Sequence, residues 1–131
     1  MLVVDTSAVL AALAGGAPPA LLARLAEDSD LHAPHLLDTE ILHALRRLVR
    51  TDAITEDKAA DIRGDVADLA VMRYPHEPLS DRVWELRTNL TAYDATFVAL
   101  AEALAVPLVT CDGALARAPG HNAVVELYTH R

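Results

Sequence analysis

Two acidic residues of the chain stand directly after apolar runs of the kind that form buried strands. Asp5 follows the apolar residues 2–4, and Asp112 closes the segment VPLVTCD at 106–112. A carboxylate beside a buried strand is unfavourable unless it is paired or binds a ligand. Ligands of open parallel sheets bind beyond the carboxyl ends of the strands, so Asp5 and Asp112 face one crevice if their strands are neighbours. For Asp5 taken alone, capping of the following helix is an alternative.

Two further acids fall in the first turns of predicted helices, where the helix dipole favours negative charge. Helical spacing places Asp94 on the inward face of a helix at 93–105 and Glu40 at the edge of the apolar face of a helix at 38–50. The alternatives are a capping box, in which Asp94 bonds back to the amide of Thr91, and a solvated Glu40. The functional interpretation depends on the four acids as a set.

Four carboxylates that converge on one crevice repel one another, and hard divalent cations relieve that repulsion. Mg²⁺ and Mn²⁺ take carboxylate oxygens and water, and they leave coordination positions open for a phosphodiester. A pair of such ions supports in-line displacement at phosphorus. The set therefore indicates metal-dependent cleavage of a nucleic acid.

Strands that alternate with helices must position these acids. Apolar runs predict strands at 2–5, 30–34, 70–75, 106–112 and 122–128. Helical spacing and breakers predict helices at about 6–13, 19–27, 38–50, 55–70, 79–90 and 93–105, the first of them capped by Thr6 or Ser7. This alternation predicts an α/β sandwich with a mostly parallel sheet.

Composition predicts one domain over residues 1–131 with a substantial core, since 53% of the residues are hydrophobic. A single cysteine, Cys111, excludes an internal disulfide, and no apolar run is long enough to cross a membrane, so a cytoplasmic protein without a membrane partner is expected. The net charge of −8 argues against broad electrostatic binding of nucleic acid. It leaves open a local site where metal ions reverse the sign.

Three segments of the chain resemble PIN-domain ribonucleases, and within that family the VapC-type toxins of bacterial toxin–antitoxin pairs. They are VVDTSAVL at 3–10, LLDTEILHALRRL at 36–48 and LTAYDATFVALAEALAVPLVTCD at 90–112. The resemblance implies a PIN-like three-layer α/β sandwich with a central, mostly parallel five-stranded sheet flanked by helices. It also implies a Mg²⁺- or Mn²⁺-dependent endoribonuclease that acts on RNA as a toxin, forms a homodimer and is neutralised by a small cognate antitoxin. Carried over by position, the catalytic and metal-binding acids are Asp5, Glu40, Asp94 and Asp112, with Ser7 and Thr110 as supporting neighbours.

One position departs from the family pattern. The family often has Asn three residues after its second acid, where this chain has His43. His43 lies on the flank of Glu40 and could contact a phosphate or stand behind the metal ligands. On the same flank, Arg47 is the best candidate for a substrate phosphate contact. Arg46 and Arg50 are interpreted as part of a solvated helix face.

Two other functions are open to a chain of this kind. A non-catalytic PIN-fold module could bind RNA without cutting it. A phosphatase with an Asp nucleophile would need a second Asp where Ser7 stands and a late Lys, and Lys58 is the only Lys. Trp84 and Phe97 are expected in the core or at a subunit interface.

Overall fold

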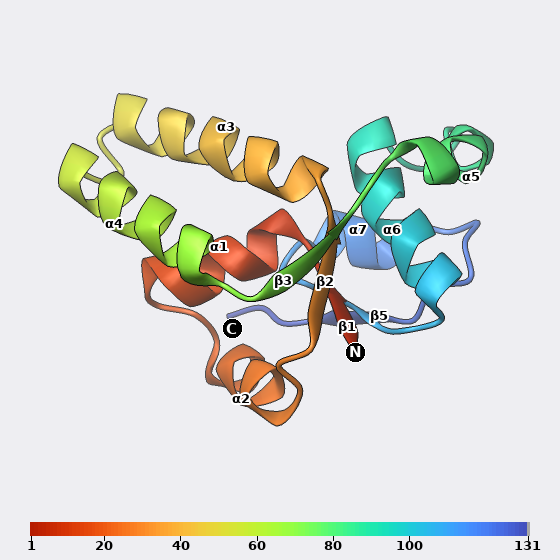
Figure 1. Cartoon of the computed structure of the whole chain (residues 1–131), viewed down its shortest axis with the longest axis horizontal. Helices are drawn as coiled ribbons and strands as arrows, with labels where there is room; N and C mark the ends of the chain where they lie inside the picture. The colour runs from red at the N-terminus through yellow and green to blue at the C-terminus, as the bar shows by residue number, and fades with distance from the viewer. Residues whose placement is uncertain (131) are drawn as a thin grey trace.

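A five-stranded parallel sheet forms the centre of the computed structural model, which describes residues 1–130 (Figure 1). Its strands are β1 (Leu2–Val4), β2 (Leu31–Pro34), β3 (Val71–Tyr74), β4 (Leu108–Thr110) and β5 (Val125–Leu127). They lie in the order β3-β2-β1-β4-β5, and each pairs with its neighbours in parallel. The chain proceeds from β1 to β3 on one side and then returns to β4 on the other. The crevice between β1 and β4 is therefore the point where parallel sheets of this type bind ligands.

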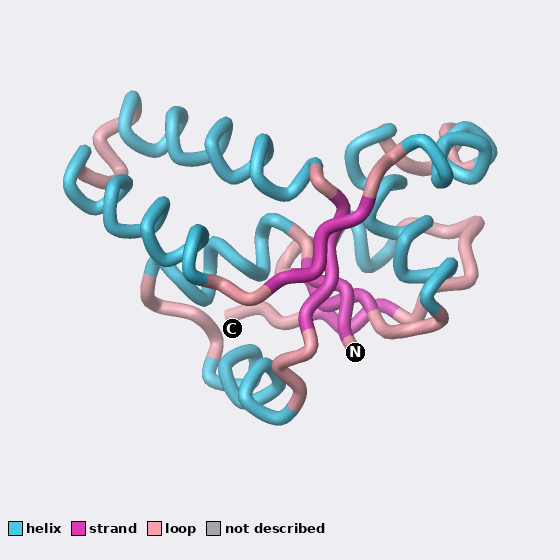
Figure 2. The backbone as a smooth tube through the Cα atoms, viewed as in Figure 1, coloured by secondary structure: helices cyan, strands magenta, loops and turns pink. Residues whose placement is uncertain are grey.

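Helices cover both faces of the sheet and complete three layers (Figures 1 and 2). On one face, α1 (Thr6–Ala14) packs against α3 (Leu36–Arg50) and α4 (Glu56–Asp68). On the other face, α6 (Ala92–Leu104) lies across β1, β2 and β4 and carries α5 (Ser80–Glu85). The helices α2 (Pro19–Glu27) and α7 (Gly113–Arg117) and the 3-10 turn η1 (Glu77–Leu79) complete the set. The predicted α/β sandwich with a parallel five-stranded sheet is confirmed.

The core is centred on β1, which both helical layers cover. All three residues of β1 are buried, which explains why its sequence has no polar alternation. Seven consecutive residues of α6, from Ala95 to Ala101, are buried, and Phe97 is 2% exposed. Within residues 1–130, no single helix is long and apolar enough to span a membrane; only α1 and α2 together, with a bend of 106° between them, reach that length and composition.

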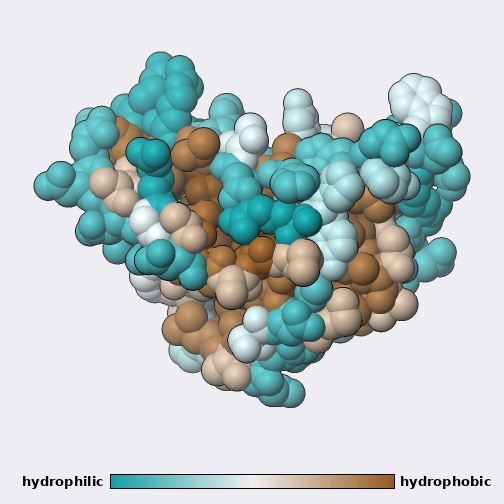
Figure 3. All heavy atoms as spheres, in the orientation of Figure 1, coloured by the Kyte–Doolittle hydropathy of each residue, from teal (hydrophilic) through white to brown (hydrophobic). Residues whose placement is uncertain are grey.

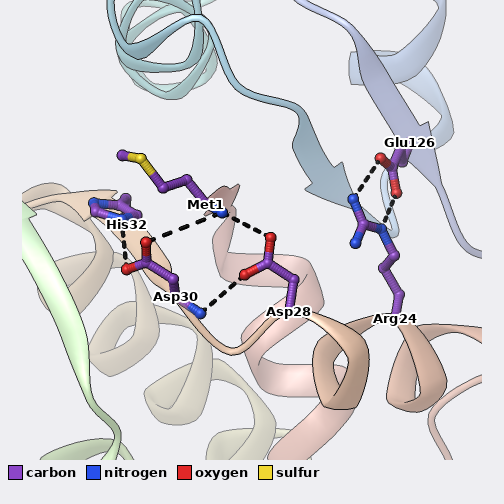
Figure 4. Close-up of polar contacts among 6 residues, drawn as sticks. All are labelled: Met1, Arg24, Asp28, Asp30, His32 and Glu126. Atoms are coloured by element: carbon purple, nitrogen blue, oxygen red, sulfur yellow. Dashed lines mark hydrogen bonds and ion pairs between the residues drawn. The ribbon is translucent and has the colours of Figure 1, made fainter.

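Polar links fasten α2 and the loop after it to the sheet (Figure 4). The Arg24 guanidinium on α2 donates two hydrogen bonds to the Glu126 carboxylate on β5, at 2.8 and 3.2 Å. His32 is buried in β2 and bonds Asp30 at 2.9 Å. These links hold the lower part of the molecule in Figure 1, away from the carboxyl ends of β1 and β4.

Three predicted elements differ from the structure. The strand predicted at 122–128 is shorter, because β5 spans only Val125–Leu127. The strand predicted at 106–112 stops at Thr110, because Asp112 accepts hydrogen bonds from Ala114 N and Leu115 N and so starts α7, a helix that the sequence pattern did not indicate. The helix predicted at 79–90 begins earlier as η1, with Pro78 in its first turn, and α5 ends at Glu85, beyond which the chain continues in turns.

Candidate active site

A cavity of about 350 Å³ opens at the carboxyl end of β1. All four predicted acids line it: Asp5 from the end of β1, Glu40 from α3, Asp94 from α6 and Asp112 from the start of α7. Its remaining lining residues are Thr6, Ser7, Leu10, His43, Ala44, Arg47 and Phe97. The structure thus brings together the acidic residues of three segments that are far apart in the sequence.

Asp5 is the most enclosed of the four acids, at 8% exposed. Its Oδ1 accepts hydrogen bonds from Ser7 Oγ at 2.7 Å and from Ala8 N at 2.9 Å. Its Oδ2 accepts one from Thr110 Oγ1 at 2.5 Å. Burial raises the pKa of Asp5, and these three hydrogen bonds oppose that rise because they stabilise the ionised form. The carboxylate caps α1 as well, so Asp5 is the cap of that helix and the prediction of Thr6 or Ser7 was wrong.

Thr6 and Ser7 have other partners. Thr6 Oγ1 donates to Glu40 Oε1 at 2.6 Å and joins α1 to α3 at the cavity wall. Ser7 Oγ also accepts from Cys111 N at 2.9 Å, which joins α1 to the end of β4. Sequence reasoning did not assign Thr6 to the site. Its position between Asp5 and Ser7 was the one available signal.

Asp94 differs from the other three acids in its hydrogen bonding. Thr91 Oγ1 accepts from Asp94 N at 3.2 Å and caps α6. Among residues 1–130, however, no donor is hydrogen-bonded to the Asp94 carboxylate, so the return half of the capping box, the alternative interpretation of Asp94, is absent from the described chain. Burial, and after it the negative charges of the three other acids, raises the pKa of Asp94 to about 6.

Asp112 and the supporting residues complete the arrangement. Asp112 Oδ1 caps α7, and Asp112 N donates to Thr110 Oγ1 at 2.9 Å. Thr110 is fully buried beneath the cavity, where it binds Asp5 and does not line the opening. His43 and Arg47 are exposed on α3 and share the wall with Glu40, as predicted. Trp84 is 68% exposed, so it is outside the core of this chain.

The possible metal ligands of the cavity suit a hard divalent ion, because all except His43 are carboxylate or hydroxyl oxygens and no cation lowers the pKa of Asp94. Within the described residues, no three Asp, Glu, His or Cys side chains form a set that could hold a metal ion as they stand. Hydrogen bonds to Thr110, Thr6 and Ala114 orient three of the carboxylates, whereas none orients Asp94.

Known proteins share this fold over nearly the whole chain. Residues 2–121 match the PIN domain family. Ribonuclease VapC1 of Mycobacterium tuberculosis is 50% identical over 127 residues, which cover 95% of this chain and 96% of that protein. Among solved structures, VapBC2 from Rickettsia felis, bound to a DNA fragment from its promoter, aligns with a TM-score of 0.71 at 15% identity and covers 97% of this chain and 98% of its own. VapBC-5 from M. tuberculosis, described as a member of the VapBC family of toxin–antitoxin systems, aligns with a TM-score of 0.61 at 23% identity and covers 98% and 97%. The chain belongs to the PIN domain family and, within it, to the VapC group.

Proposed function

We propose that this chain is an endoribonuclease that hydrolyses phosphodiester bonds of RNA with Mg²⁺ or Mn²⁺ and acts as the toxin of a toxin–antitoxin pair. The observation that carries the proposal is the cavity at the end of β1, which four carboxylates at four different elements line. The 50% identity to a protein named ribonuclease VapC1 supports the reaction, and the likeness to VapBC structures supports the biological role.

Each side chain of the cavity has a part in this proposal. Asp5, Glu40, Asp94 and Asp112 would hold the ion or ions. When bound, a divalent ion would polarise the scissile phosphate and lower the pKa of the attacking water. Thr110 and Ser7 donate hydrogen bonds that oppose the rise in the Asp5 pKa caused by burial, and Thr6 orients Glu40.

Arg47 and His43 would bind phosphate oxygens at the exposed side of the cavity. A guanidinium can donate two parallel hydrogen bonds to a phosphate, which fixes its orientation. Leu10, Ala44 and Phe97 add apolar side chains to the cavity lining, and apolar surroundings strengthen electrostatic interactions.

Two protein partners follow from the proposal. One is a small cognate antitoxin that blocks the cavity, and the other is a second copy of the chain. Trp84 is a candidate contact for the second copy, since its ring is exposed and the Arg87 guanidinium lies 4.3 Å from the ring centre. Tryptophan is enriched at protein–protein interfaces relative to the rest of the protein surface.

The proposal is tested with Asp5→Asn and Asp94→Asn, with Asp65→Asn on the exposed side of α4 as the matched control. Both site variants should lose at least about 100-fold in the rate of RNA cleavage with Mg²⁺, because each removes a charged ligand. They should also relieve growth arrest in cells, while circular dichroism shows the fold intact. Asp65→Asn should cleave like the parent chain.

Three outcomes would contradict the proposal. Full cleavage by either site variant would remove these acids from the reaction. RNA that is bound but left intact in both Mg²⁺ and Mn²⁺ would favour a non-catalytic binding module. Hydrolysis of a phenyl phosphate in place of RNA would favour a phosphatase.

A further inference from the structure

A row of unpaired arginines extends from the carboxylate cavity along α3. His43, Arg46, Arg47 and Arg50 have the spacing i, i+3, i+4 and i+7, which places them on one side of the helix. Together with Thr51 they line a shallow depression of about 410 Å³. We call these four residues the α3 basic track.

The α3 basic track adjoins the carboxylate cavity. His43 and Arg47 line both of them, so the two lie side by side on α3. From Glu40 to Arg50 the helix rises by about 15 Å, at about 1.5 Å per residue. In Figure 1 this direction leads from the centre of the molecule out along α3, and Figure 3 shows hydrophilic side chains over the outer end of α3 and α4.

Within the described part of the chain, the three arginines of the track lack ion pairs, in contrast to three other arginines. Arg24, Arg73 and Arg82 each bind a carboxylate at 2.7–2.8 Å. Among residues 1–130, no carboxylate lies within 4.0 Å of the Arg46, Arg47 or Arg50 guanidinium. In a chain with a net charge of −8, acidic partners are abundant, so three neighbouring arginines without one are available to an external anion.

Helix electrostatics explain only part of this arrangement. Cations in the last turn of a helix are favoured by its dipole, and Arg47 and Arg50 lie in the last turn of α3. The interaction of a cation with the helix dipole does not depend on which side of the helix the cation occupies. It does not require the basic residues to line one depression beside the carboxylate cavity.

We propose that the α3 basic track binds the RNA phosphates that flank the scissile phosphate. This inference rests on the proposed function, because it requires one phosphate of a polynucleotide to lie at the carboxylates. The neighbouring phosphates then need cationic contacts within a few ångströms, and the track provides them on one side. Arg46 and Arg50 thus become substrate-binding residues, in contrast to the solvated helix face that their sequence positions indicated.

The test uses the full chain with Asp94→Asn, to prevent cleavage, and measures its affinity for a short labelled single-stranded RNA across NaCl concentrations. Arg46→Ala/Arg50→Ala should weaken binding roughly 20-fold at about 0.1 M salt and lower the salt slope by about 1.4, since each lost phosphate contact on a single strand removes about 0.7. Arg46→Lys/Arg50→Lys should restore most of the slope, because it keeps the charge. Arg63→Ala, on the exposed side of α4, is the matched control.

Kinetics of the otherwise unaltered chain separate this inference from the proposed function. The double Ala variant should raise KM for RNA far more than it lowers kcat, because the track contributes binding and not chemistry. If the parent chain does not cleave RNA, the proposed function fails. If it cleaves RNA and the double variant matches the Arg63→Ala control in KM and in salt slope, only the inference about the α3 basic track fails. A variant that binds RNA normally but loses affinity for an acidic partner protein would show that the track is a protein-binding surface and would overturn the proposal.

Discussion

At the residue scale, Asp94 is the acid whose protonation the site controls most. Its carboxylate is half-buried, lacks a hydrogen-bond donor in the described chain and faces three other acids, which raises its pKa to about 6. An ordinary Asp pKa is 3.8. The folded chain therefore binds this proton more tightly than the unfolded chain does.

The sign of this shift determines a pH dependence of stability. Above about pH 6 the ionised Asp94 destabilises the fold, and this cost is relieved as the pH falls through about 6 towards 4. Without divalent ions, Asp94→Asn should stabilise the fold at pH 7.5 by on the order of 1 kcal/mol, a value reduced for the partial exposure of the group. Near pH 4 the variant and the parent should unfold at similar denaturant concentrations. Denaturant unfolding at both pH values measures the difference.

Asp65→Asn, which changes an exposed acid on α4, provides the comparison. It should leave the pH dependence as it is in the parent chain. A stabilisation by Asp94→Asn that persists unchanged to pH 4 would show that repulsion among the four acids is not its cause.

Sequence reasoning identified the residues of the cavity better than their contacts. The four acids, Ser7, His43 and Arg47 all line the cavity, and their catalytic and binding roles stay predictions. The bond from Thr6 to Glu40 could not be predicted, because it depends on the angle at which α3 crosses the start of α1. The missing return bond of Asp94 to Thr91 depends on its side-chain conformation, which spacing does not determine.

At the element scale, Thr110 joins β4 to β1 below the cavity. Its hydroxyl donates to Asp5 and accepts from Asp112 N, and the side chain is fully buried. Thr110→Val keeps the shape but leaves a buried carboxylate and a backbone N–H each without one partner. We expect a loss of about 2 kcal/mol in the free energy of unfolding. Denaturant titration should show a lower midpoint with an unchanged slope.

Thr110→Ser is the matched variant, since it keeps the hydroxyl and removes only a methyl group. Its loss should be about 1 kcal/mol or less. Equal stabilities of the two variants would mean that the Thr110 hydroxyl does not stabilise the fold through Asp5. The inferred connection between β4 and β1 would then be wrong.

The elements themselves were predictable where the local signal was strong. The apolar run of β1 and the apolar spacing of α3 gave both elements to within about two residues. The helix α7 was missed because it has five residues, too few for a periodic pattern, and because its cap, Asp112, was interpreted only as a strand-end acid. Asp5 and Asp112 each line the cavity at the end of a strand and also cap the helix that follows. A sequence pattern does not show that one residue has both positions.

At the scale of the whole molecule, the carboxylate cavity adds to the self-repulsion of a chain with a net charge of −8. The hydrogen bonds of Asp5, Glu40 and Asp112 hold three acids at one end of the sheet. Folding therefore keeps these charges closer together than the unfolded chain would. A divalent ion that binds the folded state alone shifts the equilibrium towards folding.

This coupling predicts that Mg²⁺ or Mn²⁺ raises the melting temperature in proportion to the logarithm of its concentration once the site is saturated. At about 100 times the dissociation constant the gain is about 2.7 kcal/mol, or roughly 10 °C for a chain of this size. Calorimetry at constant ionic strength, with NaCl replacing the divalent salt, separates this effect from general screening. Asp94→Asn should start from a higher melting temperature without metal and gain less from it, because one repulsive charge and one ligand are lost together. A melting temperature that follows ionic strength alone in both proteins would mean that the four acids hold no ion, and the cavity would then need another explanation for its charge.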